Sequence, residues 1–115
     1  MRPETALQRE IKAHLNAKGL WAVHVPNGAV LGGNKRQRAI QVNSLKADGM
    51  QVGFPDLLVY GGGRRLGHLE VKCEGQKQSE NQIKVQARIE AMGHKYAVVR
   101  SIADVDETLS EWGWQ

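Results

Sequence analysis

The sequence is poor in cysteine and has no long apolar run, and each absence excludes a class of protein. Cys73 is the only cysteine, so neither a disulfide framework nor a cysteine-rich zinc site can form. No apolar stretch approaches the length of a membrane span, and the N-terminus lacks the apolar region of a signal peptide. We therefore expect a protein of a reducing intracellular compartment.

Internal repeats, low-complexity tracts and interdomain linkers are also absent. A chain of 115 residues, 41% hydrophobic and 24% charged, is ordinary for a globular protein and long enough to bury a core. We expect a single domain over residues 1–115. The net charge of +4 suits a polyanionic partner, although many small basic proteins bind no nucleic acid.

Apolar periodicity and turn residues predict an alternation of helices and strands. Helices are expected over residues 3–18, 37–47, 79–92 and 103–111. Strands are expected over residues 20–25, 54–60, 65–73 and 95–100, with a glycine- and asparagine-rich loop over 26–34. The order is helix, strand, helix, strand, strand, helix, strand, helix. It is typical of a small α/β domain with a mixed sheet flanked by helices.

Charged residues interrupt the two apolar segments that are predicted to form a hairpin. Asp56 follows Pro55 at the start of the first segment, and Glu70 and Lys72 lie two residues apart in the second. Because side chains alternate along a strand, Glu70 and Lys72 share one face. Charged groups are not buried in strands unless they are paired or bind a metal. The pattern therefore indicates a site at which these side chains converge.

The register of the hairpin decides whether Asp56 lies near Glu70, and the sequence does not fix that register. Two carboxylates that lie together repel unless a cation sits between them. Hard oxygen ligands suit Mg²⁺ or Mn²⁺, which keep several waters and accept phosphate oxygens. An exposed hairpin with a Glu–Lys ion pair is the alternative, since Glu-x-Lys is common by chance. The preceding Pro-Asp, at hairpin spacing, favours the metal site.

The first helix carries a carboxylate on its apolar face. At about 100° per residue, Glu4 falls within the stripe of Leu7, Ile11 and Leu15, whereas Glu10 points the opposite way. We therefore expect Glu4 to face the sheet and Glu10 to face water. The alternative role for Glu4 is to complement the positive end of the helix dipole.

The third helix carries an amide on its apolar face. Gln82 lies on the stripe of Val85, Ile89 and Met92. Ser79-x-x-Gln82 also has the form of a capping box, in which Gln82 bonds back to the Ser79 backbone. The two roles are compatible, because a capped N-terminus near the site also presents free backbone N–H groups to an anion.

Six segments spread over nearly the whole chain resemble the VRR-NUC nucleases, a branch of the PD-(D/E)xK superfamily, and especially their small stand-alone members in phages and bacteria. The segments are PETALQ (3–8), HVPNG (24–28), LKADGMQVGFPDL (45–57), LEVK (69–72), SENQ (79–82) and GHKYAVVRS (93–101). Two departures are visible. Ser101 stands where the family often has the second Arg of Val-Arg-Arg, and Glu80 stands where the Ser-Pro-x-Gln element has its proline.

The resemblance implies a restriction-endonuclease-like core, with a small mixed sheet flanked by helices, and it implies roles for several residues. Asp56 and Glu70 would bind a divalent metal, with the Val71 carbonyl as a backbone ligand. Lys72 would orient or activate the attacking water. Two further residues are implied to act beside this group, Glu4 next to the metal and Gln82 as a positioning residue for Lys72 or a phosphate.

Basic residues cluster in two places. Lys35, Arg36 and Arg38 follow the glycine-rich loop, and Arg64 and Arg65 lie in the predicted hairpin turn. Phosphate contacts by such residues give affinity for DNA without sequence readout. For each of them the alternative is a solvated surface charge.

The residues and the resemblance together lead to one functional hypothesis. It is a Mg²⁺- or Mn²⁺-dependent endonuclease that hydrolyses phosphodiester bonds in branched or Holliday-junction-like DNA. The resemblance implies a homodimer, in the cytoplasm of a bacterium or phage-infected host, and we expect neither membrane association nor a small-molecule cofactor. The alternatives are a non-catalytic DNA-binding module that retains the fold, and a subunit that a partner must activate.

Overall fold

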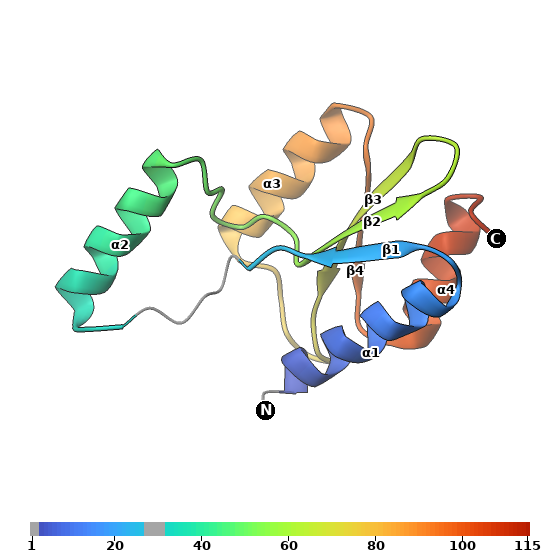
Figure 1. The fold of residues 1–115 in the computed structure, drawn as a ribbon, viewed down its shortest axis with the longest axis horizontal. Helices are drawn as coiled ribbons and strands as arrows, with labels where there is room; N and C mark the ends of the chain where they lie inside the picture. Colours follow the sequence, from blue (N-terminus) through green and yellow to red (C-terminus); the bar gives the residue numbers. More distant parts are fainter. Residues whose placement is uncertain (1–2, 27–31) are drawn as a thin grey trace.

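The computed structural model describes residues 3–26 and 32–115. Its eight elements follow the order predicted from the sequence, which is thereby confirmed (Figure 1). The loop predicted over 26–34 falls partly on residues 27–31, which lie outside the described residues. The elements are α1 (Pro3–Ala17), β1 (Trp21–His24), α2 (Lys35–Ala47), β2 (Leu57–Gly61), β3 (Arg65–Val71), α3 (Glu80–Ala91), β4 (Lys95–Val99) and α4 (Ile102–Glu111).

The four strands form one mixed sheet in the order β1-β2-β3-β4. Strand β2 is antiparallel to both β1 and β3, and β3 pairs with β4 in parallel. The parallel pair requires a crossover, which α3 provides, as is usual for parallel strands. The small mixed sheet flanked by helices is the fold class predicted from the sequence.

One face of the sheet carries the main hydrophobic core. Strand residues such as Leu57, Leu69 and Val71 are fully buried on this face against Ile11 and Leu15 of α1. Helix α4 also packs against this face and touches α1 (Figure 1). Fully burying a side chain of this kind stabilises the fold by about 1.5–3 kcal/mol, so this face dominates the stability of the domain.

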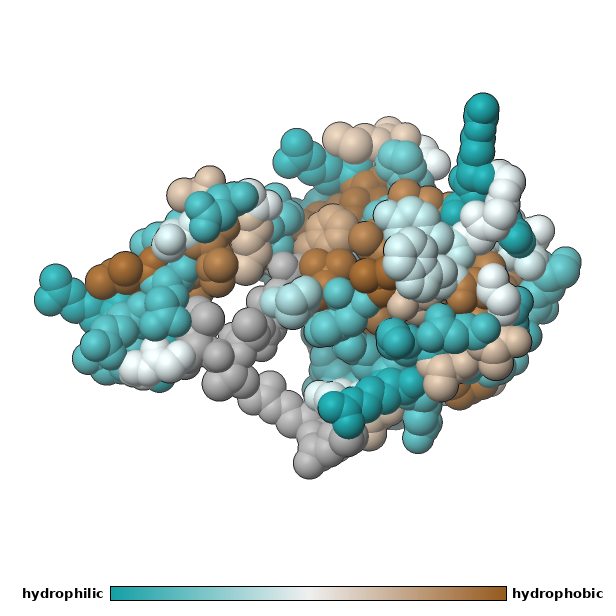
Figure 2. All heavy atoms as spheres, in the orientation of Figure 1, coloured by the Kyte–Doolittle hydropathy of each residue, from teal (hydrophilic) through white to brown (hydrophobic). Residues whose placement is uncertain are grey.

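The opposite face of the sheet is covered over only part of its width. Val85 and Ile89 of α3 pack against Tyr96 of β4, which pairs with β3. Beyond α3, on β1 and β2, the side chains of Trp21 and Tyr60 are 65% and 39% exposed. Figure 2 shows apolar side chains gathered on the visible face of the main body, with hydrophilic side chains around them.

Helix α2 stands apart from the sheet, and none of its residues is buried (Figure 1). It begins at Lys35 rather than at the predicted residue 37. Asn34 caps it: the Asn34 side chain accepts from the Gln37 N–H, and the Gln37 side chain accepts from the Asn34 N–H, both at 2.9 Å. This capping box satisfies two N-terminal donors and starts the helix two residues earlier.

The strands are shorter than the sequence predicts. Strand β2 begins at Leu57 rather than at residue 54, because the Phe54 N–H bonds to the Gln51 carbonyl in a turn and Pro55 has no N–H to donate. Strand β3 ends at Val71, although the Lys72 N–H still bonds to the Val99 carbonyl at 3.0 Å.

Among residues 3–26 and 32–115, no helix is long and apolar enough to cross a membrane.

Candidate functional site

The hairpin register brings two carboxylates together at the end of β2 and β3. Leu57 pairs with Leu69, so Asp56 lies opposite Glu70, one residue further along. The Asp56 side chain turns to accept a hydrogen bond from the Val71 N–H, with 2.8 Å between Oδ2 and N. The register that the sequence left open is therefore the one that joins Asp56 and Glu70.

The side chain of Glu70 is almost completely buried, which is unusual for a carboxylate. Only 1% of it is exposed, and its Oε1 has no hydrogen-bond partner among the residues that the structure describes. Burial, and then the neighbouring carboxyl group of Asp56, raise the pKa of Glu70 from 4.5 to about 9. The exposed hairpin with a Glu–Lys pair is thus wrong, because β3 is an inner strand covered on both faces.

Two charged residues act on Glu70 from outside the pair. The positive charge of Lys72 lowers its pKa and the negative charge of Glu4 raises it, both less than Asp56 does. No direct Lys72–Glu70 ion pair is recorded between described residues. The structure therefore places Lys72 and Glu4 around the carboxylate pair, and it leaves Glu10 exposed, as the helical periodicity predicts.

Gln82 links the start of α3 to the carboxylate pair. Its Oε1 accepts from the Ser79 N–H at 2.7 Å, and the Ser79 hydroxyl accepts from the Gln82 N–H, which completes the predicted capping box. Its Nε2 donates to Oε2 of Glu70 at 3.4 Å. The side-chain amide of Gln82 therefore caps α3 and also contacts Glu70. It links the position of Glu70 to that of the helix.

Two residues at this edge of the sheet were not predicted as site residues. Nε2 of Gln8 lies 2.9 Å from Nδ1 of His24, and the same Nδ1 lies 3.2 Å from the Asp56 carbonyl oxygen. The Val25 N–H donates to that carbonyl as well. The sequence carried a signal for Gln8, because it lies one helical turn after Glu4 on the face of α1 that is turned to the sheet.

The donor set fits a hydrated divalent cation better than a fully protein-ligated one. Among residues 3–26 and 32–115, no group of three or more His, Cys, Asp or Glu could hold a metal ion. Magnesium is commonly bound by one or two carboxylates and completes its shell with water and phosphate oxygens. Asp56 and Glu70 supply two carboxylates, and the unpartnered buried Oε1 of Glu70 is an oxygen that a cation would satisfy.

The first basic cluster lies on the outer helix. Lys35, Arg36 and Arg38 occupy the first turns of α2 and are exposed. The Arg38 guanidinium donates to the Gly33 carbonyl at 2.7 Å, whereas Lys35 and Arg36 project without a recorded ion pair in the described part of the chain. These charges lie on a helix that Figure 1 shows apart from the sheet.

The second basic cluster lies at the other end of the hairpin from Glu70. Arg64 has a φ of 66° in the exposed turn. Arg65 donates to the Gly62 carbonyl at 2.7 Å, and its guanidinium carbon lies 5.5 Å from the centre of the Trp114 ring. Glu70 lies five residue steps along the strand from Arg65, which is about 17 Å. Trp112 and Trp114 pack against the core.

Two solved structures resemble this chain over most of its length. One, described as a VRR_NUC domain, is 26% identical, covers 94% of both chains and has a TM-score of 0.65. The other, described as a VRR_NUC domain protein, is 16% identical, covers 97% of this chain and 88% of that chain, and has a TM-score of 0.70. No family model and no curated protein matches. The resemblance to VRR-NUC domains predicted from the sequence is thus confirmed.

Proposed function

We propose that this chain, which has the fold of a VRR-NUC domain, is a divalent-metal-dependent endonuclease that hydrolyses phosphodiester bonds in DNA. One observation carries the proposal: Glu70 is buried opposite Asp56, and one of its carboxylate oxygens has no partner in the part of the chain that the structure describes. A pair of carboxylates of which one is buried is unfavourable by itself and is usually kept for a function. A nuclease-type activity agrees with the two VRR_NUC structures.

Asp56 and Glu70 would hold Mg²⁺ or Mn²⁺, and the Val71 carbonyl is the backbone ligand that we assign. A cation bound there would polarise a phosphate oxygen and lower the pKa of a bound water. Lys72 lies close enough for its charge to act on Glu70, and its ammonium would stabilise negative charge that develops on the phosphate. Gln82 would keep Glu70 oriented through its 3.4 Å contact.

The proposed substrate is branched DNA. The exposed Lys35, Arg36 and Arg38 on a helix without acidic residues would contact phosphates and would not read the base sequence. A homodimer would place two such sites on one branched molecule, and symmetric cutting of two strands requires that arrangement. Sedimentation of the purified chain tests it. The proposed location is the cytoplasm of a bacterium or of a phage-infected host, as expected from the resemblance.

The alternative proposal is a DNA-binding module that is non-catalytic or needs a partner for activity. The chain retains Asp56, Glu70 and Lys72 and places them at one edge of the sheet, which favours catalysis over a module that has lost activity. An inactive purified chain that cuts only when a second protein is added would support the partner-activated form.

A cleavage assay tests the proposed function. Purified protein is incubated with duplex, flap and four-way junction DNA in Mg²⁺, in Mn²⁺ or in a chelator. Lys72→Ala is expected to bind DNA with unchanged affinity and to cut at least about a hundredfold more slowly, since it removes charge stabilisation at the reacting phosphate. Lys12→Ala, which removes an exposed ammonium from α1, is the matched control and is expected to cut normally. Cutting that survives both the chelator and Glu70→Gln would refute the assignment.

A further inference from the structure

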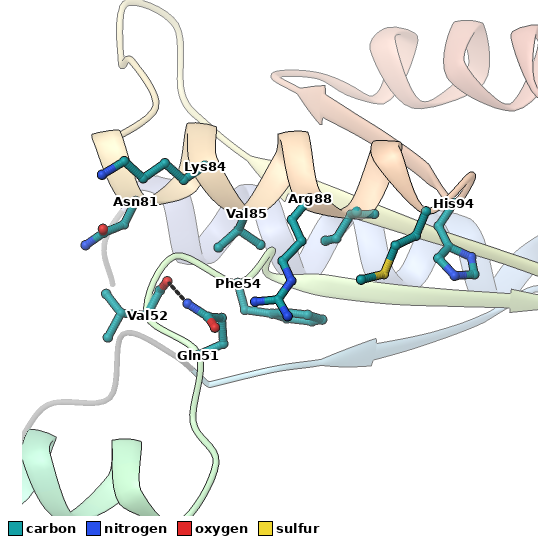
Figure 3. A pocket seen from close by; sticks show the side chains of 10 residues that line it. Gln51, Val52, Phe54, Asn81, Lys84, Val85, Arg88 and His94 are labelled. Carbon is teal, nitrogen blue, oxygen red and sulfur yellow. Dashed lines mark hydrogen bonds between the residues drawn. The ribbon is translucent and has the colours of Figure 1, made fainter.

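A pocket of about 450 Å³ lies along α3 and has no role in the chemistry above. It opens between α3 and the segment that leads into β2 (Figure 3). Ligand pockets in proteins have volumes of roughly 300–1,000 Å³, so this one can hold a small organic group. The residues that line it are Gln51, Val52, Phe54, Asn81, Lys84, Val85, Arg88, Ile89, Met92 and His94.

Both walls of the pocket lead, within one or two residues of the chain, to residues of the proposed active site. Phe54 precedes Asp56 by two residues, and Asn81 is the neighbour of Gln82, which contacts Glu70. The two walls meet at Gly53, where an added Cβ would lie 2.7 Å from the carbonyl carbon of Asn81. These short connections make the DNA strand at the carboxylates the ligand that we consider for the pocket.

The polar side of the pocket is a row of three side chains on α3. Asn81, Lys84 and Arg88 follow the i, i+3, i+7 spacing that places residues on one side of a helix, and Figure 3 shows them along the wall of the pocket. Lys84 lies 3.3 Å from Glu80, but both side chains are largely exposed, so this pair is weak. The ion pairs recorded for the described residues do not include Arg88.

The remaining walls of the pocket are apolar. Val52 and Phe54 come from the segment before β2, and Val85, Ile89 and Met92 come from α3. The side chain of Met92 is 63% exposed, so part of this lining faces solvent. An apolar hollow bordered by two cations suits a ligand with a flat apolar part attached to an anion, which describes a nucleotide.

We propose that this pocket binds an unpaired nucleotide of the DNA substrate, with the base on the apolar lining near Phe54 and the phosphates on Lys84 and Arg88. The proposal rests on the proposed function, since it concerns the DNA that the carboxylates would cut. A base inside an intact duplex is stacked between its neighbours and cannot enter a pocket, whereas an unpaired base can. The chain should therefore prefer DNA that has unpaired nucleotides beside the scissile bond.

Binding measured without cleavage tests the proposal. Fluorescence anisotropy in a chelator compares a blunt duplex, the same duplex with a single-stranded extension, and that extension with abasic residues. The extension should raise affinity by about tenfold and the abasic extension should lose that gain, as expected for one or two bases held by stacking contacts. Val52→Trp and Met92→Trp, which fill the pocket from its two walls, should each abolish the preference.

The charged side of the pocket is tested separately. The double variant Lys84→Ala, Arg88→Ala should bind the extended DNA about tenfold more weakly, since each phosphate contact contributes to affinity. Lys12→Ala removes a charge from α1, away from the pocket, and should bind like wild type. Equal affinity for blunt, extended and abasic DNA would overturn the proposal, as would a full preference in both pocket-filling variants. Pocket binding without metal-dependent cutting would instead refute the proposed function alone.

Discussion

Replacing Glu70 by glutamine should stabilise the metal-free protein while it abolishes cleavage. Glutamine has the shape of a protonated glutamic acid but carries no charge to bury. In the fold, burial and Asp56 raise the pKa of Glu70 from 4.5 to about 9, so the metal-free native state holds this side chain protonated at neutral pH. The unfolded chain, in contrast, ionises it at its ordinary pKa.

The magnitude follows from these two pKa values. The native state binds the proton more tightly, so the contribution of Glu70 to stability is greatest below pH 4.5 and is lost progressively as pH rises toward 9. At pH 7, which is about 2.5 pH units above the pKa of Glu70 in the unfolded chain, protonating Glu70 on folding costs about 3 kcal/mol of stability. Glu70→Gln avoids this cost. Its midpoint of thermal unfolding in a chelator should be higher than that of wild type by roughly 10 °C.

Thermal unfolding followed by circular dichroism at pH 4.5 and pH 7 measures the effect. The gain from Glu70→Gln should be largest at pH 7 and nearly absent at pH 4.5. Magnesium should stabilise wild type at pH 7, because an ion that binds only the ionised native site favours the fold, and it should leave Glu70→Gln unaffected. Equal stability of the two proteins at pH 7, or equal stabilisation of both by magnesium, would refute the reasoning.

Two further changes probe how the site is held. Gly53→Ala should cost about 1–3 kcal/mol in urea unfolding, since Gly53 has a φ of 86° and the new Cβ would meet Asn81 at 2.7 Å. Gly63 has a φ of 66° and no neighbour near an added Cβ, so Gly63→Ala measures the backbone strain alone. An equal loss of stability in both variants would show that the contact with Asn81 contributes nothing. Gln82→Met keeps the length of the side chain but removes the N–H that donates to Oε2 of Glu70 and the oxygen that accepts from the Ser79 N–H. It should lower stability in a chelator at pH 7 by on the order of 1 kcal/mol, and unchanged stability would show that these contacts are unimportant.

The composition of the site could be predicted from the sequence because a charged residue inside an apolar pattern is visible in one dimension. Asp56, Glu70 and Lys72 interrupt strand patterns, and Glu4 and Gln82 interrupt helical stripes. The structure gathers all five at one edge of the sheet. Their catalytic and metal-binding roles stay predictions, as do the DNA contacts of the basic clusters.

Other contacts could not be predicted from the sequence, because they join residues that are far apart in the chain. The position of Arg65 against Trp114 requires the C-terminal segment to return to the hairpin turn. The contact of Gln8 with His24 requires α1 to lie beside the end of β1. No periodic pattern records such neighbours, because each arises from the packing of two elements and not from the propensity of either.

Hydrophobic periodicity and turn residues, which are local properties, were sufficient to determine the order of helices and strands and the residues that interrupt them. The tertiary structure alone decided the hairpin register that sets Asp56 against Glu70, the burial that raises the pKa of Glu70, and the incomplete cover that leaves a pocket beside α3. The physical reason is that the register of a strand and the burial of its side chains depend on pairing and packing with elements that are distant in the sequence.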